Sequence, residues 1–326
     1  MHFVKRMWQI LRNFNIYYPT TQGNSDVKET QMKAKKGTYS VRVTSPNQME
    51  IQVKKGIVKA AILNDIHSPY YYPPAVGLAL TILKEEKPDI VILNGDIIDC
   101  FAISKFRKTG RERNIRVEIE VTRQILKELR KSVPHSFLVF VEGNHEFFLQ
   151  KYIYRNAPAL APLEELELKF LLRLDGLGIV FLPRIEEYGS FTFDAFPIVK
   201  FTDEHANLVI SVFHGDGIPL RGSTINKARN MLFYLHGNFI CGHWHQSHFW
   251  EIYDVNGFPY RSYVVPSLAY PKPHWVMGAW ELGFAFLEIA AAGNFNVEIV
   301  KFNPVQQDAT LRCKWKGKEY KVPLHD

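Results

Sequence analysis

The sequence of 326 residues contains no apolar run near the roughly 20 residues that a membrane-spanning helix needs. The N-terminal stretch MHFVKRMWQILRNFNIYY carries early positive charge, but Arg12 interrupts its apolar part and no small-residue cleavage site follows, which argues against a secretory signal. Cysteine is scarce, because only Cys100, Cys241 and Cys313 occur, and they lie far apart. This excludes a disulfide framework and the cysteine pairs of structural zinc sites, and predicts a cytoplasmic protein with reduced thiols.

Positive charge is concentrated at one end of the chain. The first 57 residues hold ten Lys or Arg and three Asp or Glu, which accounts for the whole net charge of +7. The remainder holds 30 residues of each sign. A basic N-terminal segment followed by a remainder with no net charge predicts contact with a polyanion such as nucleic acid. A solvated tail that aids solubility has the same composition, so both interpretations stay open.

Hydrophobic spacing divides the chain into three parts. It predicts a helix over residues 2–15, a polar linker over 19–37 and a hairpin around Pro46-Asn47-Gln48. From residue 57, short apolar strands alternate with helices, which is the pattern of a parallel sheet with crossover helices. Residues 158–174 also look helical. After about residue 178 strands dominate, with one helix in STINKARNMLFYL, so we expect an α/β half followed by a mostly β half.

Five of the predicted strands are followed by Asp, Asn or His. In chain order these segments read DIH (65–67), GDIID (95–99), GNHE (143–146), HG (214–215) and GHWH (242–245). Ligands of open α/β sheets bind outside the carboxyl ends of the strands, so the five loops are expected to converge. Their carboxylate, imidazole and amide groups are ligands for Mn, Fe, Zn or Ni. Each segment alone has a plain structural interpretation as a loop, turn or strand-end histidine, but the ordered set predicts a metal site.

The ordered set resembles the signature of the calcineurin-like metallophosphoesterases, which is D-x-H, G-D-x-x-D, G-N-H-[DE], H and G-H-x-H. No block is missing here, and the resemblance covers roughly residues 57–302. It implies a four-layer α/β/β/α sandwich, in which two mixed sheets are flanked by helices. The expected organisation is a basic N-terminal extension over residues 1–56, the metallophosphoesterase domain over 57–302, and a C-terminal extension over 303–326 that packs on the domain.

The resemblance also assigns roles to the matching residues. One divalent ion would be bound by Asp65, His67 and His245, a second by Asn144, His214 and His243, and Asp96 would bridge them. His145 would face the scissile group without binding metal. Asp99 is placed either to orient His145 or another imidazole, or only to cap the following loop. Cys100, Cys241 and His248 are expected to be bystanders.

These roles predict a metal-dependent phosphoester hydrolase with two ions per chain. Manganese is the leading choice, and iron, zinc, nickel and magnesium are alternatives. A hydroxide shared by the ions would attack phosphorus in line, and His145 would assist the leaving group.

The substrate is less well defined by the sequence. Basic residues of two loops, Arg107, Arg111 and Arg221, could bind further phosphates, although FRKTGRERN (106–114) also suits a solvated loop. Tyr70 begins a tyrosine run that could stack on bases or only pack within its loop. Gln246 stands where many relatives have a basic residue. We expect a phosphodiesterase or nuclease acting on nucleic acid or a nucleotide, with a phosphomonoesterase or a non-catalytic nucleic-acid-associated scaffold as alternatives. No membrane partner is expected, and the oligomeric state, including a homo-oligomer, stays open.

Overall fold

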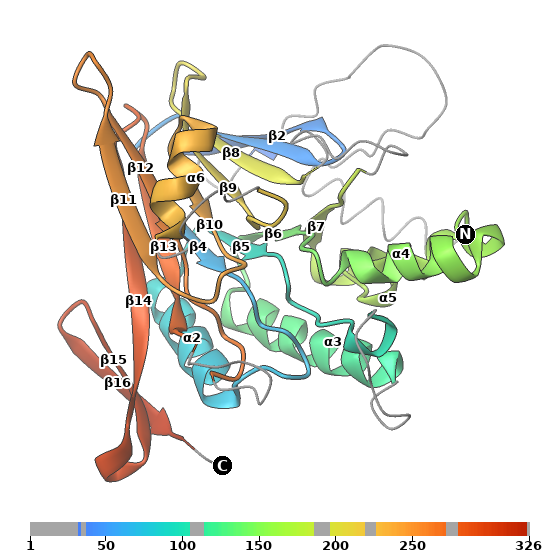
Figure 1. Ribbon diagram of the computed structural model, residues 1–326. Coiled ribbons are helices and arrows are strands. Elements are labelled where there is room, and N and C mark those ends of the chain that lie inside the picture. Colours follow the sequence, from blue (N-terminus) through green and yellow to red (C-terminus); the bar gives the residue numbers. More distant parts are fainter. Residues whose placement is uncertain are drawn as a thin grey trace, which may run out of the picture.

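The computed structural model describes residues 32–33, 37–104, 114–185, 196–218, 226–271 and 280–324 of the chain. Two mixed sheets lie face to face, with helices on their outer sides (Figure 1). The predicted four-layer sandwich is therefore confirmed. The expected helix over residues 2–15 and the segment SFTF (190–193) of the expected strand-rich half lie outside the described residues. None of the described helices combines the length and the apolar content needed to cross a membrane.

The first sheet, called sheet A, contains in spatial order β1 (Met32–Lys33), β2 (Tyr39–Ser45), β3 (Gln48–Val53), β8 (Ile198–Thr202), β9 (Leu208–Phe213), β10 (Phe239–Cys241), β12 (Pro259–Val264) and β11 (His248–Tyr253). The second, called sheet B, contains β16 (Lys318–Pro323), β15 (Thr310–Trp315), β14 (Phe295–Val305), β13 (Leu282–Ala290), β4 (Ile57–Leu63), β5 (Ile90–Asn94), β6 (Phe137–Val141) and β7 (Ile179–Leu182). The helices are α2 (Pro73–Glu86), α3 (Ile115–Ser132), α4 (Phe147–Asn156), α5 (Leu168–Leu171) and α6 (Lys227–Leu235).

Strands β4 to β7 form the parallel part of sheet B, and their side chains are buried on both faces. Ala60 and Ile62 of β4 belong to the core between the two sheets, whereas Ala61 and Leu63 face the core formed with α2 and α3. Figure 1 shows these two helices together on the side of sheet B away from sheet A. Burial on both faces explains why these strands read as continuous apolar runs.

The outer face of sheet A is covered by α6. Ala228, Met231 and Leu232 of this helix are buried against Phe239 and Val264 of the sheet. Within sheet A, β9, β10 and β12 are parallel neighbours. The second half of the chain thus also contains parallel pairing, which places the carboxyl ends of β9 and β10 at one edge.

The hairpin expected in the N-terminal extension is β2–β3, and it is part of sheet A. β3 pairs in parallel with β8, and Val41, Met49 and Ile51 are buried in the core between the sheets. The boundary at residue 57 therefore separates two segments that share one core, and removing the hairpin would open that core.

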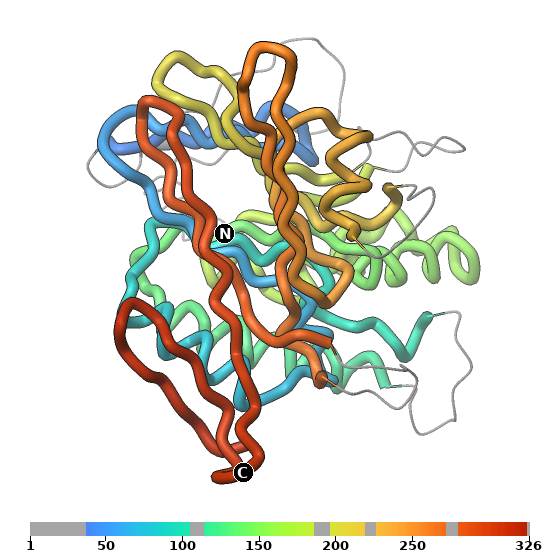
Figure 2. The backbone as a smooth tube through the Cα atoms, turned by 60° about the vertical axis from the view of Figure 1, so that its left-hand side comes forward, coloured from blue at the N-terminus to red at the C-terminus, as the bar shows by residue number. Residues whose placement is uncertain are grey.

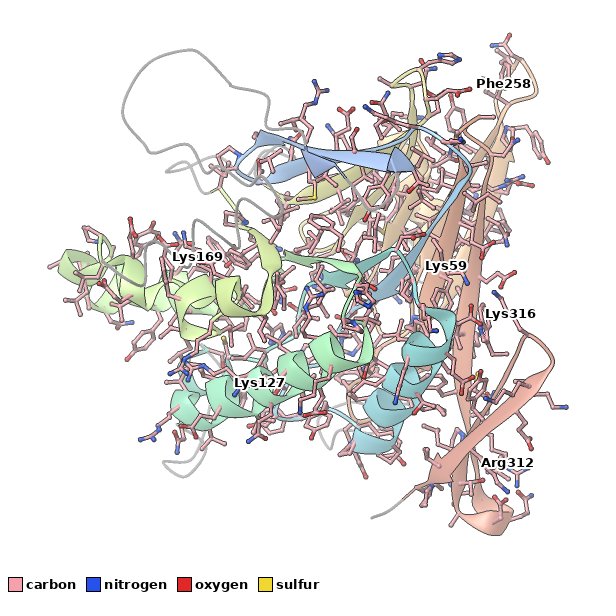
Figure 3. The ribbon with its side chains drawn as sticks, turned by 180° about the vertical axis from the view of Figure 1, so that it is seen from behind. Lys59, Lys127, Lys169, Phe258, Arg312 and Lys316 are labelled. Carbon is pink, nitrogen blue, oxygen red and sulfur yellow. The ribbon has the colours of Figure 1, made fainter. Side chains whose placement is uncertain are left out.

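The C-terminal hairpin β15–β16 packs against α2 (Figure 2). The indole Nε1 of Trp315 donates to Glu86 at 2.8 Å, and the hydroxyl of Tyr320 donates to Glu85 at 2.7 Å. Lys59 and Lys316, both labelled in Figure 3, lie 2.5 and 3.0 Å from the Glu86 carboxylate. Burial acts to raise the pKa of Glu86, but these lysines lower it to about 2.

Residues 158–174 form separate turns instead of the expected helix. The turns are η4 (Pro158–Leu160), η5 (Glu164–Leu166) and the short α5. Pro158 and Pro162 have no N–H to donate, and proline disfavours a helical conformation at the residue before it, so a continuous helix cannot form here.

Candidate metal centre

The seven expected ligands come together at the carboxyl ends of five strands. Asp65 and His67 follow β4, Asp96 follows β5, and Asn144 follows β6, which are adjacent parallel strands of sheet B. His214 follows β9, and His243 and His245 follow β10, which are adjacent parallel strands of sheet A. The two sheets thus contribute about half of the site each, and the site lies at the edge where both sets of strands end.

The first group consists of Asp65, His67 and His245, all of them buried. The Nε2 atoms of His67 and His245 are 3.1 Å apart, and His245 Nε2 is 3.2 Å from Asp65 Oδ1. Asp65 Oδ2 accepts a hydrogen bond from the backbone N–H of His243 at 2.8 Å, which leaves Oδ1 directed at the imidazoles.

The second group consists of Asp96, His214 and His243, with Asn144 beside it. His214 Nε2 lies 3.1 Å from Asp96 Oδ2 and 3.2 Å from Asn144 Oδ1. The ring of His243 lies 5.2 Å from that of His214 between centroids. Asp96 Oδ2 is also 3.8 Å from His67 Nε2 of the first group. Asp96 is therefore the carboxylate between the two groups.

The protein holds these side chains with unusual backbone conformations. Five of the seven have positive φ, namely Asp65 (51°), His67 (52°), Asp96 (53°), His243 (68°) and His245 (54°). Such values are uncommon for residues other than glycine, cluster at functional sites and persist only where the surrounding structure imposes them. Because five such residues lie in these loops, the surrounding structure must hold the loops in place, as is typical of a functional site.

Two glycines allow the loops to approach one another. A Cβ added to Gly242 would lie 2.7 Å from Asp65 Oδ2, and one added to Gly95, whose φ is 83°, would lie 2.5 Å from His214 Nδ1. Both distances are shorter than a Cβ can tolerate. Any larger residue at either position would displace an expected ligand.

The hydrogen bonds of the imidazoles fix which nitrogen faces the site. His67 Nδ1 lies 2.6 Å from Asp99 Oδ1, and His214 Nδ1 lies 2.9 Å from the backbone oxygen of Asn94. Both oxygens are acceptors, so each Nδ1 carries a proton and each ring directs Nε2 inward, where Nε2 offers a lone pair whenever the ring is neutral. Asp65 Oδ1 is buried and accepts no hydrogen bond. Inward lone pairs and an unpartnered carboxylate oxygen repel one another unless a cation lies between them, so the donor set fits a metal ion.

The pKa shifts have the same cause. Burial acts to lower the pKa of His214, but the adjacent Asp96 carboxylate raises it to about 10. Burial acts to raise the pKa of Asp96, but the charges of His214 and His145 hold it well below its usual value. A buried cluster of acceptors needs positive charge in its centre, from protons or from metal ions.

His145 and Asp99 form a third group beside the ligands. His145 Nδ1 donates to the backbone oxygen of Asp99 at 2.8 Å and lies 3.0 Å from its Oδ1. The same Oδ1 accepts from His67, so one carboxylate oxygen orients two imidazoles. His145 Nε2 consequently faces the site, 3.9 Å from Asp96 Oδ2, and its side chain is 22% exposed. Of the two roles considered for Asp99, the geometry favours orientation of imidazoles.

Glu146 is a site residue to which sequence reasoning gave no role. Its buried carboxylate accepts four backbone N–H groups, from Asp96 (2.9 Å), Ile97 (2.6 Å), Ile98 (3.1 Å) and Gly143 (2.9 Å). It therefore connects the GDIID loop to the GNHE loop. The sequence signal that could have identified Glu146 as a site residue is its position as the fourth residue of the GNHE block.

Trp280 is the second such residue. Its ring meets that of His245 edge to face at a centroid distance of 3.9 Å and lies 6.3 Å from that of His67. His245 Nδ1 is buried without a hydrogen-bond partner, and this geometry allows an N–H···π contact with the indole. No pattern in the sequence connects Trp280 to the histidines, because only the tertiary fold brings β13 to the end of β10.

The expected substrate contacts are described only in part. Tyr70 is 36% exposed and meets Phe101 edge to face at 6.0 Å, three residues beyond His67. Arg107, Arg111 and Arg221 lie outside the described residues. Cys100 and Cys241 are fully buried, and His248 lies 3.3 Å from Gln246 instead of entering either ligand group.

A sandwich of two mixed sheets with Asp, Asn and His at five strand ends defines the metallophosphoesterase class. The family described as calcineurin-like phosphoesterase matches residues 58–261, more than half of the sequence, and the chain belongs to this family. No curated protein matches the chain.

Solved structures of low sequence identity are similar to this chain. They include a purple acid phosphatase from yellow lupin (14% identity, 84% of this chain and 56% of that chain, TM-score 0.38). Vacuolar protein sorting 29 from Cryptosporidium parvum is 12% identical over 82% of this chain and 97% of its own, with a TM-score of 0.37. A dimetal phosphatase from Danio rerio is 13% identical over 83% of this chain and 100% of its own, with a TM-score of 0.35.

Proposed function

We propose that this protein hydrolyses phosphoester bonds with two divalent metal ions, and that its substrate is a phosphodiester of a nucleic acid or nucleotide. The observation that carries the proposal is the pair of buried ligand groups joined by Asp96, whose Oδ2 lies 3.1 Å from His214 Nε2 and 3.8 Å from His67 Nε2. A bridging carboxylate between two sets of neutral imidazoles suits a two-metal site.

Each ligand group would hold one ion. Asp65, His67 and His245 would bind the first, Asn144, His214 and His243 the second, and Asp96 both. Bound ions of this kind lower the pKa of water to near neutrality and offset negative charge on the phosphoryl oxygens. Mixed carboxylate, imidazole and amide donors suit manganese, which we propose as the ion, with iron, zinc, nickel and magnesium as alternatives.

His145 would act on the substrate. Its Nδ1–H is held by Asp99, so its orientation is fixed and Nε2 is directed to the space beside Asp96. From there it can hydrogen-bond a phosphoryl oxygen or donate a proton to the leaving oxygen, a contribution of about 10²–10⁴-fold. Asp99 is a positioning residue, because it contacts the imidazoles and not the substrate.

The preference for a nucleic acid or nucleotide rests on charge and on aromatic exposure. The first 57 residues carry the entire net charge of +7, which would attract a polyanion and release its counterions. Tyr70 lies at the first ligand loop with 36% of its surface exposed, where a base could stack on it. Arg107, Arg111 and Arg221 are proposed as further contacts.

The test compares bis(p-nitrophenyl) phosphate with p-nitrophenyl phosphate on metal-free protein reconstituted with Mn²⁺. We expect about two metal ions per chain, hydrolysis that requires metal, and a higher kcat/KM for the diester. A preference for the monoester would show a phosphatase instead. Fewer than one ion per chain together with no hydrolysis would show a non-catalytic scaffold of the same fold. Gels with single- and double-stranded substrates test the nuclease version, which fails if neither is cleaved.

A further inference from the structure

Lys227, the first residue of α6, is held in place beside the loop that carries two of the expected ligands. Its Nζ lies 5.2 Å from the centre of the Trp244 ring and donates to Gln246 Oε1 at 3.1 Å. Trp244 stands between His243 and His245, and Gln246 follows them directly. The ammonium group is therefore held by Trp244, which lies between the two histidines, and by Gln246, which follows them.

This cation has no carboxylate partner among the residues that the structure describes. Its contacts there are the neutral amide of Gln246 and the face of Trp244. The Glu281 carboxylate, whose charge acts on His248, pairs with Ser247 and Lys301. Lys227 is half-buried, and burial lowers its pKa. A partly desolvated ammonium without a counter-charge costs free energy, which an incoming anion would offset.

The position of Lys227 relative to the metal centre suits a substrate contact. The ring of Trp244 meets that of His243 at a centroid distance of 4.8 Å, so the ammonium and an expected ligand of the second group contact the same indole. The field of Lys227 also reaches His248, whose pKa is lowered by burial and then by this charge. His248 Nε2 lies 3.3 Å from the same Gln246 Oε1 that anchors the lysine.

We propose that Lys227, held by Trp244 and Gln246, binds a second phosphate group of the substrate, next to the phosphoester held at the metal centre. The site therefore prefers nucleotides or oligonucleotides with two or more phosphates over esters with only one. This inference rests on the proposed function and adds a specificity-determining residue to it. Gln246 is the positioning residue, since its amide oxygen fixes the lysine without supplying charge.

The test uses two esters of thymidine that differ in one phosphate. Thymidine 5′-(p-nitrophenyl phosphate) is compared with the same ester carrying a 3′-phosphate, using the full chain with Mn²⁺. We expect the wild type to have a lower KM for the phosphorylated ester. In Lys227→Gln the KM for that ester should rise about tenfold or more, with kcat and the KM for the plain ester within about twofold, because one charge-assisted hydrogen bond is lost.

Arg229→Gln is the matched control. Arg229 is an exposed cation two residues along the same helix, and its guanidinium lies over Phe233 and Trp250 instead of Trp244. This variant should leave the preference between the two esters unchanged. An equal loss for both esters in Lys227→Gln, an unchanged preference, or the same effect from Arg229→Gln would each overturn the inference.

A binding measurement separates this inference from the proposed function. Calorimetry in a His145→Ala background with Mn²⁺ compares thymidine 3′,5′-diphosphate with thymidine 5′-monophosphate. Tighter binding of the diphosphate that Lys227→Gln abolishes would support the second phosphate site even if the wild type hydrolysed no ester. Equal binding of both nucleotides would refute the site while leaving the hydrolase proposal intact.

Discussion

Replacing Glu146 by Gln tests whether this carboxylate holds the metal centre together. Oε1 accepts from Ile97 and Ile98, and Oε2 accepts from Asp96 and Gly143. Glutamine keeps one oxygen, which can still accept two of these bonds. Its NH2 group replaces the other oxygen and faces two backbone N–H donors, which then lose their acceptor.

The cost follows from those two donors. A buried donor left without a partner costs about 1–3 kcal/mol, and two of them together cost about 2–6 kcal/mol. Part of this is offset because the substitution removes a buried charge: burial, and then the charge of Asp96, raise the pKa of Glu146. We therefore expect a net loss of about 2–4 kcal/mol in the free energy of unfolding. Hydrolysis should also fall, because Asp96 is held at φ 53° partly through its bond to Glu146.

Glu118→Gln provides the matched control. Its buried carboxylate accepts the backbone N–H of Phe101 on Oε2 at 3.1 Å and that of Ala102 on Oε1 at 2.8 Å, and neither residue is an expected ligand. Urea unfolding of the metal-free proteins should show a loss for Glu118→Gln no more than half that for Glu146→Gln, with metal-dependent hydrolysis preserved in the control. A smaller loss for Glu146→Gln than for Glu118→Gln, or unchanged hydrolysis in Glu146→Gln, would refute the reasoning.

Three further outcomes are expected. Burial raises the pKa of Glu118 from 4.5 to about 7, so its contribution to stability is full below pH 4.5 and is lost as the pH rises through 7. In urea unfolding, the wild type should therefore lose about 3 kcal/mol relative to Glu118→Gln over this pH range. Parallel pH profiles of the two proteins would contradict this. Asp99→Asn should lower kcat for bis(p-nitrophenyl) phosphate about 10–100-fold and change its pH profile, because His67 and His145 lose their shared carboxylate; a change in KM alone would argue against this role. Deleting residues 1–36 should leave the fold and the turnover of small substrates intact while weakening the binding of nucleic acid. Deleting residues 1–56 also removes the buried Met49 and Ile51 and should give insoluble protein. Equal solubility and equal circular dichroism spectra of the two deletion variants would contradict the shared core.

The convergence of the seven expected ligands could be predicted because the ends of buried strands have a strong sequence signal. Continuous apolar runs such as IVKAAIL and DIVILN marked the strands, and the polar residues that follow had to lie at their carboxyl ends. The prediction of a helix over residues 158–174 was wrong because it followed the spacing of hydrophobic residues and gave too little weight to Pro158 and Pro162. Trp280 could not be predicted, since its contact with His245 depends on how β13 lies beside the end of β10.

The sequence by itself determined the fold class, and the types and order of the expected ligands along the chain, because hydrophobic patterning, strand-end chemistry and the five-block motif are local properties. Tertiary structure alone decided which ligands face one another. The groups Asp65–His67–His245 and Asp96–His214–His243 each combine residues of both sheets, and their separations depend on how the sheets pack. It also decided the bonds of Glu146, the shared carboxylate of Asp99 and the placement of Lys227 beside Trp244. Each of these joins segments far apart in the sequence, and such contacts arise only when the chain closes into one core.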